Sequence, residues 1–354
     1  MPYNSGMSLQ EIQSRYGVTE IAKLASNENP YGPAPEVLKC LKLNSPDLYL
    51  YPDSGSNDLR DRLADYLNVP GENLIFGNGS EDLISIICRS VIETGDRIIT
   101  LYPSFPLHED YAALMGAHVE RVCVNEHLEI DLPALIKAVE TPAKMLIFSN
   151  PMNPVGCWLN PGQLHQVIAA KHPDTLLVLD EAYYEYAISG CYQSGQTMLG
   201  PDAGNWIILR TFSKAWGLAG LRIGFGICSS IELRRALDLT RTPFNINKIA
   251  QSAARMALDC CDCMKSNIEK VSAERESVVD RLLSLGFTVA PSLGNFVFFD
   301  SKRCSTDLAD RLLQCGTVVK PWKQEGFDQY VRVSIGSSEE NSKFLSDMER
   351  VMAI

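Results

Sequence analysis

Short apolar runs alternate with longer amphipathic stretches through the middle of the chain, from residue 74 to residue 228. Each run has the length of a β-strand and is largely apolar, which is typical of strands covered on both faces. The intervening stretches carry the spacing of amphipathic helices. The pattern predicts a doubly wound α/β domain on a mostly parallel sheet, with strands at 74–76, 98–101, 145–148, 176–179, 206–209 and 223–227.

The C-terminal part of the chain follows a different pattern. Helical stretches lead into short apolar runs at 295–299, 317–319 and 331–335, with further helices between and after them. This indicates a smaller α+β domain, completed by the N-terminal segment. We therefore expect an N-terminal arm and small-domain segment at 1–34, a large domain at 35–260 and a small C-terminal domain at 261–354.

Charge and composition narrow the possible partners. The net charge of -11 argues against nucleic acid or an anionic membrane as a partner. No apolar stretch approaches the ~20 residues of a membrane-spanning helix, and the N-terminus shows no secretory signal. The eleven scattered cysteines favour a reduced, cytoplasmic protein. Cys260, Cys261 and Cys263 lack a second cysteine or histidine pair at zinc spacing, so we expect no metal site.

Small and polar residues follow the first and third of the predicted strands. Gly77-Asn78-Gly79-Ser80-Glu81 precedes a helix, where glycines and free amides suit a phosphate, although a plain turn and cap would use the same residues. Asp82 stands where a dinucleotide motif would need its third glycine. The run at 150–156 contains two Asn-Pro steps, which predict a rigid turn that is either structural or functional.

Asp180 ends the next apolar run and is followed by Glu181, Ala182 and Tyr183. A carboxylate in this position is costly to bury unless it is paired with a cation, and a protonated pyridine nitrogen would be such a partner. A helix N-cap is the alternative. If Asp180 pairs with a pyridine nitrogen, its carboxylate is paired only when the cofactor is present.

Lys214 follows the fifth run, among small hydroxyl residues and glycines, with Arg222 eight residues further on. This arrangement suits an amine nucleophile beside a phosphate clamp, whereas an isolated lysine could simply be solvated. Taken together, the strand ends supply what pyridoxal 5'-phosphate requires: a Schiff-base lysine, an acid for the pyridine nitrogen, a hydroxyl for the phenolic oxygen and a phosphate site. A nicotinamide cofactor would need no such lysine.

The same residues carry a resemblance over nearly the full length of the chain. It resembles the fold-type-I pyridoxal-phosphate aminotransferases, within them the histidinol-phosphate aminotransferase group. The shared motifs are Pro2-Tyr3, 23–32 (KLASNENPYG), 51–53 (YPD), 77–80 (GNGS), 153–154 (NP), 180–183 (DEAY), the Lys214 segment, 243–247 (PFNIN) and 330–336 (YVRVSIG). Threonine-phosphate decarboxylases and aromatic aminotransferases are relatives of this group.

The resemblance implies a role for each matching position. Lys214 would hold the cofactor as a Schiff base and shuttle a proton, and Asp180 would pair with its pyridine nitrogen. Tyr183 and Asn153 would hydrogen-bond the phenolic oxygen, and Phe105 would stack on the ring. The phosphate would be held by Gly79, Ser80, Glu81, Thr211, Ser213 and Arg222.

Further positions concern the dimer and the substrate. The resemblance implies a homodimer in which Tyr51 reaches the phosphate of the neighbouring subunit's cofactor. Arg332 would pair with a substrate anion, and Tyr3 would lie in an arm that closes over the substrate. Lys320 stands where the family usually has a phosphate-binding arginine, so the charge is kept and the bidentate fork is lost. Met152 and Val155 replace an asparagine and a threonine of the usual loop.

The resemblance therefore implies an aminotransferase that moves the amino group of an anionic L-amino compound to 2-oxoglutarate, with histidinol phosphate as the first candidate donor. Alternatives are an aromatic amino acid aminotransferase and a decarboxylase of a phosphorylated amino acid, such as threonine phosphate. Glu28 stands where the decarboxylases have a hydrophobic residue, which favours transamination. A third alternative is a cofactor-binding regulatory protein without turnover. The absence of a DNA-binding extension in these 354 residues argues against it.

Overall fold

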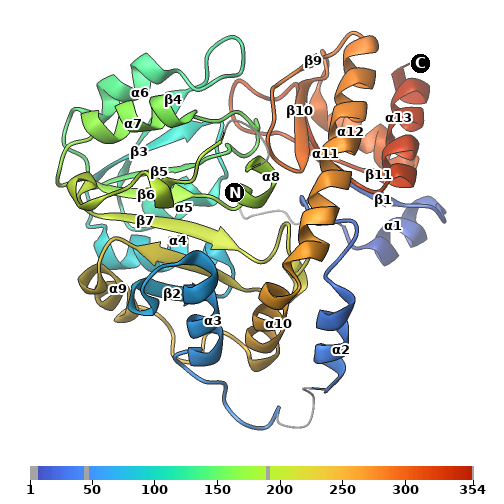
Figure 1. Ribbon diagram of the computed structural model, residues 1–354. Coiled ribbons are helices and arrows are strands. Elements are labelled where there is room, and N and C mark those ends of the chain that lie inside the picture. The colour runs from blue at the N-terminus through green and yellow to red at the C-terminus, as the bar shows by residue number, and fades with distance from the viewer. Residues whose placement is uncertain (1–6, 44–47, 189–191, 353–354) are drawn as a thin grey trace.

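The computed structural model describes residues 7–43, 48–188 and 192–352, so Tyr3 lies outside the described residues. A seven-stranded sheet lies at the centre of the larger part (Figure 1). Its strand order is β2-β8-β7-β6-β5-β3-β4, and only β8 runs against its neighbours, which confirms the mostly parallel sheet. The strands are β2 (Leu74–Gly77), β3 (Arg97–Tyr102), β4 (His118–Cys123), β5 (Met145–Ser149), β6 (Leu176–Asp180), β7 (Trp206–Thr211) and β8 (Gly224–Cys228).

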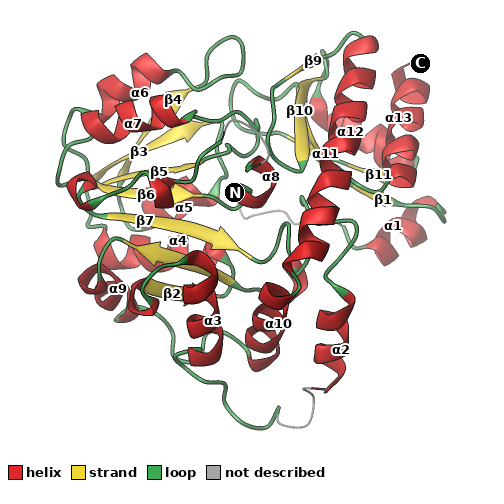
Figure 2. Ribbon diagram, viewed as in Figure 1, coloured by secondary structure: helices red, strands yellow, loops and turns green. Residues whose placement is uncertain are grey.

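Helices cover both faces of this sheet (Figure 2), because its central strands are apolar on both sides. Along β5, Met145 and Ile147 pack with α4, while Leu146 and Phe148 pack in the cluster that includes α6 and α7. The helices of this part are α3 (Asn57–Leu67), α4 (Ser80–Val91), α5 (Leu107–Leu114), α6 (Leu132–Val139), α7 (Pro161–Ala170), α8 (Tyr184–Ala187), α9 (Ile231–Asp238) and α10 (Lys248–Asp259).

The smaller part is built on a four-stranded antiparallel sheet of order β12-β13-β10-β9. Its strands are β9 (Thr288–Val289), β10 (Phe296–Asp300), β12 (Lys320–Pro321) and β13 (Tyr330–Ser334), with helices α11 (Cys261–Ser284), α12 (Ser305–Gln314) and α13 (Ser338–Met352). Near the N-terminus, α1 (Leu9–Tyr16) precedes β1 (Ala22–Lys23), which pairs with β11 (Thr317–Val318), and α2 (Pro35–Leu43) then packs on α10. The N-terminal segment thus contacts the C-terminal part. The domain boundaries at residues 34 and 260 stay a prediction.

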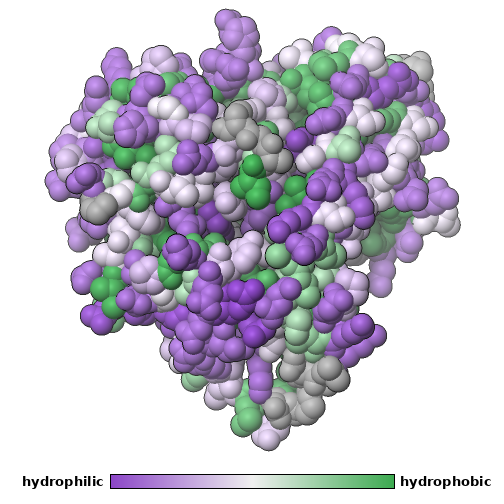
Figure 3. Space-filling model, viewed as in Figure 1, coloured by the Kyte–Doolittle hydropathy of each residue, from purple (hydrophilic) through white to green (hydrophobic). Residues whose placement is uncertain are grey.

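The face of the molecule that Figure 3 shows is largely polar. Hydrophilic side chains cover much of the face in Figure 3, with smaller hydrophobic groups between them. Among the described helices, none combines the length and the apolar character that crossing a membrane requires.

Candidate active site

Lys214 lies in the loop between β7 and β8, just beyond the carboxyl end of β7. Its Nζ donates a hydrogen bond to the Ser26 carbonyl oxygen at 2.9 Å and lies 5.8 Å from the centre of the Tyr183 ring. Burial, and then the positive charge of Arg332, lower the pKa of the Lys214 amine from 10.5 to about 7. A large fraction of the amine is therefore neutral near pH 7, the form that attacks a carbonyl carbon.

Asp180 ends β6, the strand next to β7, and is buried. The structure corrects the expectation that only a cofactor would pair this carboxylate: its Oδ2 lies 3.1 Å from Nε2 of His108, and its Oδ1 accepts from the Ala182 amide at 3.0 Å. His108 is fully buried, and its Nδ1 has no hydrogen-bond partner among the described residues. The ring of Phe105 meets that of His108 edge-on at 5.6 Å. His108 thus fixes the orientation of the Asp180 carboxylate through Oδ2.

The hydroxyl oxygen of Tyr183 accepts two hydrogen bonds, from Nδ2 of Asn27 at 2.9 Å and from Nδ2 of Asn153 at 3.2 Å. The other end of the Asn153 amide accepts from Nη1 of Arg332 at 2.7 Å. Arg332 is buried on β13 and also donates to the Ala25 carbonyl oxygen at 2.6 Å. The structure therefore joins three of the predicted site residues, from three separate segments, in one network.

The start of α4 lies against Arg222. Gly79 has a φ of 89°, and a Cβ added there would lie 2.6 Å from Nη2 of Arg222. Likewise, a Cβ at Gly224 would lie 2.5 Å from the Ser80 amide nitrogen. Glycine at these two positions thus lets Arg222 and β8 approach the start of α4, whose first amides can stabilise an anion.

Hydroxyl groups complete this cradle. The Thr211 hydroxyl donates to Oγ of Ser213 at 2.9 Å, and Nη1 of Arg222 lies 3.5 Å from the same Oγ. Nη2 of Arg222 lies 3.7 Å from a carboxylate oxygen of Glu81. Helix amides, two hydroxyls and a guanidinium therefore gather beside Lys214, a donor set that fits a phosphate group.

Residues 19–347 match the family model for aminotransferases of class I and II. The chain belongs to this family. The aminotransferase is 51% identical over 351 residues to "Histidinol-phosphate aminotransferase 1" of Mesorhizobium japonicum, covering 99% of this chain and 96% of that protein. It is 49% identical over 353 residues to "Histidinol-phosphate aminotransferase 3" of Rhizobium meliloti, covering 100% and 95%.

Solved structures of similar proteins share its fold. The histidinol-phosphate aminotransferase from Sinorhizobium meliloti, in complex with pyridoxal-5'-phosphate, superposes with a TM-score of 0.91 at 29% identity, covering 100% of this chain and 95% of that one. The L-threonine-O-3-phosphate decarboxylase from Porphyromonas gingivalis gives a TM-score of 0.82 at 23% identity, covering 94% and 100%, and shows the fold alone. The predicted family and fold class, the type I pyridoxal-phosphate-dependent transferase fold, are confirmed.

Tyr51 and Lys320 are the remaining predicted site residues that the structure of the aminotransferase describes. Tyr51 is 82% exposed and stacks on Phe244 with ring centres 4.7 Å apart, so within this chain it does not join the cradle. Lys320 lies opposite Arg332 in the β12–β13 pair. Burial, and then the charges of Arg332 and Lys323, lower the pKa of Lys320. The roles of both residues stay predictions.

Glu181, the residue after the end of β6, serves the scaffold. Its two oxygens accept from Arg210 at 2.9 Å, from Tyr192 and Ser194 at 2.8 Å each, and from the Gly195 amide at 2.7 Å. The side chains of Glu181 and Arg210 are 0% and 3% exposed. This ion pair and its hydrogen bonds hold the segment around Ser194 and Gly195 against the end of β6.

Glu181→Ala should lower the free energy of unfolding of the aminotransferase by about 3–5 kcal/mol, because it leaves the buried Arg210 charge without its carboxylate. Urea unfolding of the purified variant measures the change. Glu349→Ala is the control: it removes the carboxylate of a half-exposed pair with Arg281 and should cost about 1 kcal/mol or less. Equal losses for both variants would show that the buried ion pair contributes no more to the free energy of unfolding than the half-exposed pair does.

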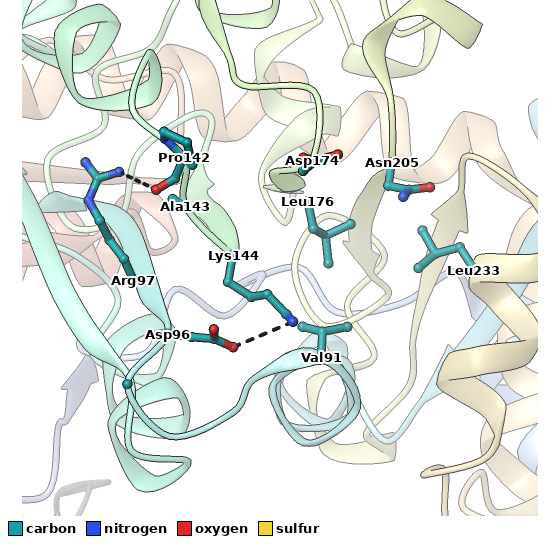
Figure 4. Close-up of a pocket in the computed structure, with 11 residues that line it drawn as sticks. Val91, Asp96, Arg97, Pro142, Ala143, Lys144, Asp174, Leu176, Asn205 and Leu233 are labelled. Atoms are coloured by element: carbon teal, nitrogen blue, oxygen red, sulfur yellow. Dashed lines mark hydrogen bonds and ion pairs between the residues drawn. The ribbon is translucent and has the colours of Figure 1, made fainter.

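A hollow of about 510 Å³ lies at the opposite edge of the sheet, at the amino ends of β3, β5 and β6 (Figure 4). Its lining includes Lys144, whose amine lies 3.7 Å from Asp96, together with Arg97 and Leu176. This hollow is remote from Lys214 and holds none of the predicted site residues. In the part of the chain that the structure describes, no three histidine, cysteine or acidic side chains gather as a metal site would require.

Proposed function

We propose that this aminotransferase uses pyridoxal phosphate, held on Lys214, to move the amino group of an anionic L-amino compound to 2-oxoglutarate. The observation that carries the proposal is the Lys214 amine, with its pKa of about 7, at the strand end next to Asp180 and beside the phosphate cradle. When bound, the cofactor supplies a carbonyl group for the amine and a ring that withdraws electrons from the reacting carbon.

The residues of the chain then have separate tasks. Lys214 holds the cofactor and moves the proton at the substrate's Cα, while Asp180, oriented by His108, keeps the ring nitrogen protonated. Tyr183 and Asn153 bind the phenolic oxygen, and Phe105 covers the ring. The phosphate is assigned to the cradle of Gly79, Ser80, Glu81, Thr211, Ser213 and Arg222.

Histidinol phosphate is the proposed amino donor. The names of the Mesorhizobium and Rhizobium proteins, at 51% and 49% identity over nearly the whole chain, support it. Arg332 and Lys320 supply two cations on adjacent strands for the anion of the substrate. Glu28, which forms an ion pair with Lys23 at 2.8 Å, is a carboxylate at the position where the decarboxylases have a hydrophobic residue, and this favours transamination.

A substrate panel with product identification tests this proposal. Histidinol phosphate and 2-oxoglutarate should yield the ketone and glutamate, and release of carbon dioxide from threonine phosphate should be absent. Ketone formation from aromatic amino acids alone would assign the enzyme to the aromatic aminotransferases. Carbon dioxide release without glutamate would assign it to the decarboxylases.

Lys320→Arg should raise kcat/KM for histidinol phosphate roughly tenfold, about 1.4 kcal/mol, because a planar guanidinium binds phosphate with two hydrogen bonds where the ammonium group offers a point charge. Its kcat/KM for an amino acid without a phosphate should change little. Steady-state kinetics with both donors measures the contrast. A neutral or harmful effect, together with a better donor than histidinol phosphate for the wild type, would leave only the broader aminotransferase assignment.

The proposal extends to a cytoplasmic homodimer with shared active sites. Support comes from exposed apolar side chains around Tyr51, namely Leu48, Tyr49, Leu50 and Phe244, whose burial a partner subunit would provide. Tyr51 would then reach the partner's phosphate cradle. Light scattering should give twice the chain mass of 39.2 kDa, and a monomeric mass under assay conditions would end this part of the proposal.

A further inference from the structure

Asn27 is a buried residue of the N-terminal segment, 1% exposed, with a left-handed backbone φ of 55°. The backbone N–H of Asn27 donates to Oγ of Ser334 at 2.7 Å, and the Ser334 hydroxyl donates to the side-chain Oδ1 of Asn27 at 2.8 Å. This exchange turns Nδ2 of Asn27 toward the hydroxyl oxygen of Tyr183, to which it donates at 2.9 Å. The carbonyl oxygen of Asn27 accepts from Asn295 at 3.0 Å, which anchors the backbone.

Two chains of hydrogen bonds therefore run from strand β13 to the same oxygen. One passes from Arg332 through Asn153 to Tyr183, and the other passes from Ser334 through Asn27 to Tyr183. Arg332 and Ser334 are two residues apart, so their side chains leave the same face of β13. The small sheet thus contacts Tyr183 of the large part through two parallel arms.

We propose that Asn27, held by Ser334, is a positioning residue that orients the Tyr183 hydroxyl as a hydrogen-bond donor toward the cofactor's phenolic oxygen. The inference rests on the proposed role of Tyr183. An oxygen that accepts from both Asn27 and Asn153 has its lone pairs occupied, so its hydroxyl acts on a third group only through its own O–H. The accepted bonds also polarise that O–H and make it a stronger donor.

The backbone of Asn27 explains the residue type and suggests the variant. Asparagine tolerates a positive φ better than most residues, and glycine tolerates it without strain. Asn27→Gly therefore removes the amide group while keeping the backbone conformation. Ser334→Ala leaves the Asn27 amide in place but removes the group that orients it. Asn29→Ala is the matched control, because it deletes an amide of the same segment that bonds to the Ala215 carbonyl oxygen rather than to Tyr183.

The experiment is a pH titration of the visible absorbance of the protein loaded with pyridoxal phosphate. A strong Tyr183 donor stabilises the deprotonated form of the bound cofactor, so weakening it should raise the midpoint. Asn27→Gly should raise the midpoint by about 0.5 of a pH unit, the size expected from one hydrogen bond between neutral groups. Ser334→Ala should shift it in the same direction by less, and Asn29→Ala should leave it unchanged.

A double-mutant cycle separates positioning from general damage to the fold. In a Tyr183→Phe background, Asn27→Gly should give no further shift, because its effect passes through the Tyr183 hydroxyl. An equal shift in both backgrounds, a lowered midpoint, or no shift in either single variant would overturn the inference. Thermal unfolding without the cofactor provides a second readout: both Asn27→Gly and Ser334→Ala should lower Tm. If the wild type itself lacks a cofactor on Lys214, the proposed function fails; if only the Asn27 shift is missing, the inference alone fails.

Discussion

Replacing Lys214 with alanine should lower kcat by at least about 10⁴-fold and abolish covalent attachment of pyridoxal phosphate. The variant loses both the amine that holds the cofactor and the group that moves the substrate's proton, and proton transfer by a positioned side chain alone is worth about 10²–10⁴-fold. Steady-state kinetics measures the first effect. Borohydride reduction and peptide mapping of the wild type should place the cofactor adduct on Lys214.

Lys171 provides a control for the Lys214 variant. Lys171 is buried and burial lowers its pKa, as for Lys214, but its amine donates to the carbonyl oxygens of His172 and Thr175, away from the predicted site residues. Lys171→Met should therefore keep the adduct. An adduct on any lysine other than Lys214 in the wild type would refute the assignment.

The pKa of Lys214 also sets the pH dependence of cofactor attachment. Below pH 7 the amine is mainly protonated and cannot attack a carbonyl, and above pH 7 it is mainly neutral. The rate at which the apoprotein takes up the cofactor should rise about tenfold from pH 6 to pH 8 as the neutral fraction grows. Stopped-flow absorbance measures this rate. A rate that begins to rise only above pH 9 would indicate an amine with an ordinary pKa.

Asp180→Asn should lower kcat by about 10³-fold with little loss of stability. The amide keeps a hydrogen bond to His108 but carries no charge to hold a proton on the cofactor's ring nitrogen. Turnover and urea unfolding should be measured on the same preparation. Asp180→Ala should be equally inactive and also less stable, by about 1–3 kcal/mol, because it leaves the buried Nε2 of His108 without its partner. Near wild-type turnover in the asparagine variant would reduce Asp180 to a capping residue.

The sequence predicts the chemistry-bearing edge of the large sheet because parallel strands deliver their carboxyl ends to one side. Asp180 ends β6 and Lys214 follows the adjacent strand β7, so the positions of the apolar runs bring the two residues to the same edge of the sheet. The edge strand β4 was missed, since His118, Glu120 and Arg121 are exposed and interrupt the apolar pattern on which the prediction depends.

His108 and Asn27 were missed for a different reason. His108 lies 72 residues before its partner Asp180, and Asn27 lies 156 residues before Tyr183. Periodicity reports which face of an element is buried, but it does not report which polar group another segment brings to it. Phe105 and His108 are three residues apart where the chain turns into α5, with the His108 backbone amide donating to the Phe105 carbonyl oxygen at 3.0 Å, so their short spacing is a local signal that the two side chains lie together.

The division of labour between the two sheets has a consequence for how such an enzyme can diverge. The residues assigned to the cofactor come from the large sheet and its loops, whereas Lys320 and Arg332 belong to the small antiparallel sheet. A duplicated gene could therefore acquire a new amino donor through substitutions in β12 and the residues after it, without passing through an inactive ancestor. Arg332 is the restraint on this freedom. Its guanidinium also donates a hydrogen bond to Asn153, which is assigned to the cofactor. A substitution of Arg332 that favours a new substrate would therefore also disturb the cofactor site that every amino donor uses.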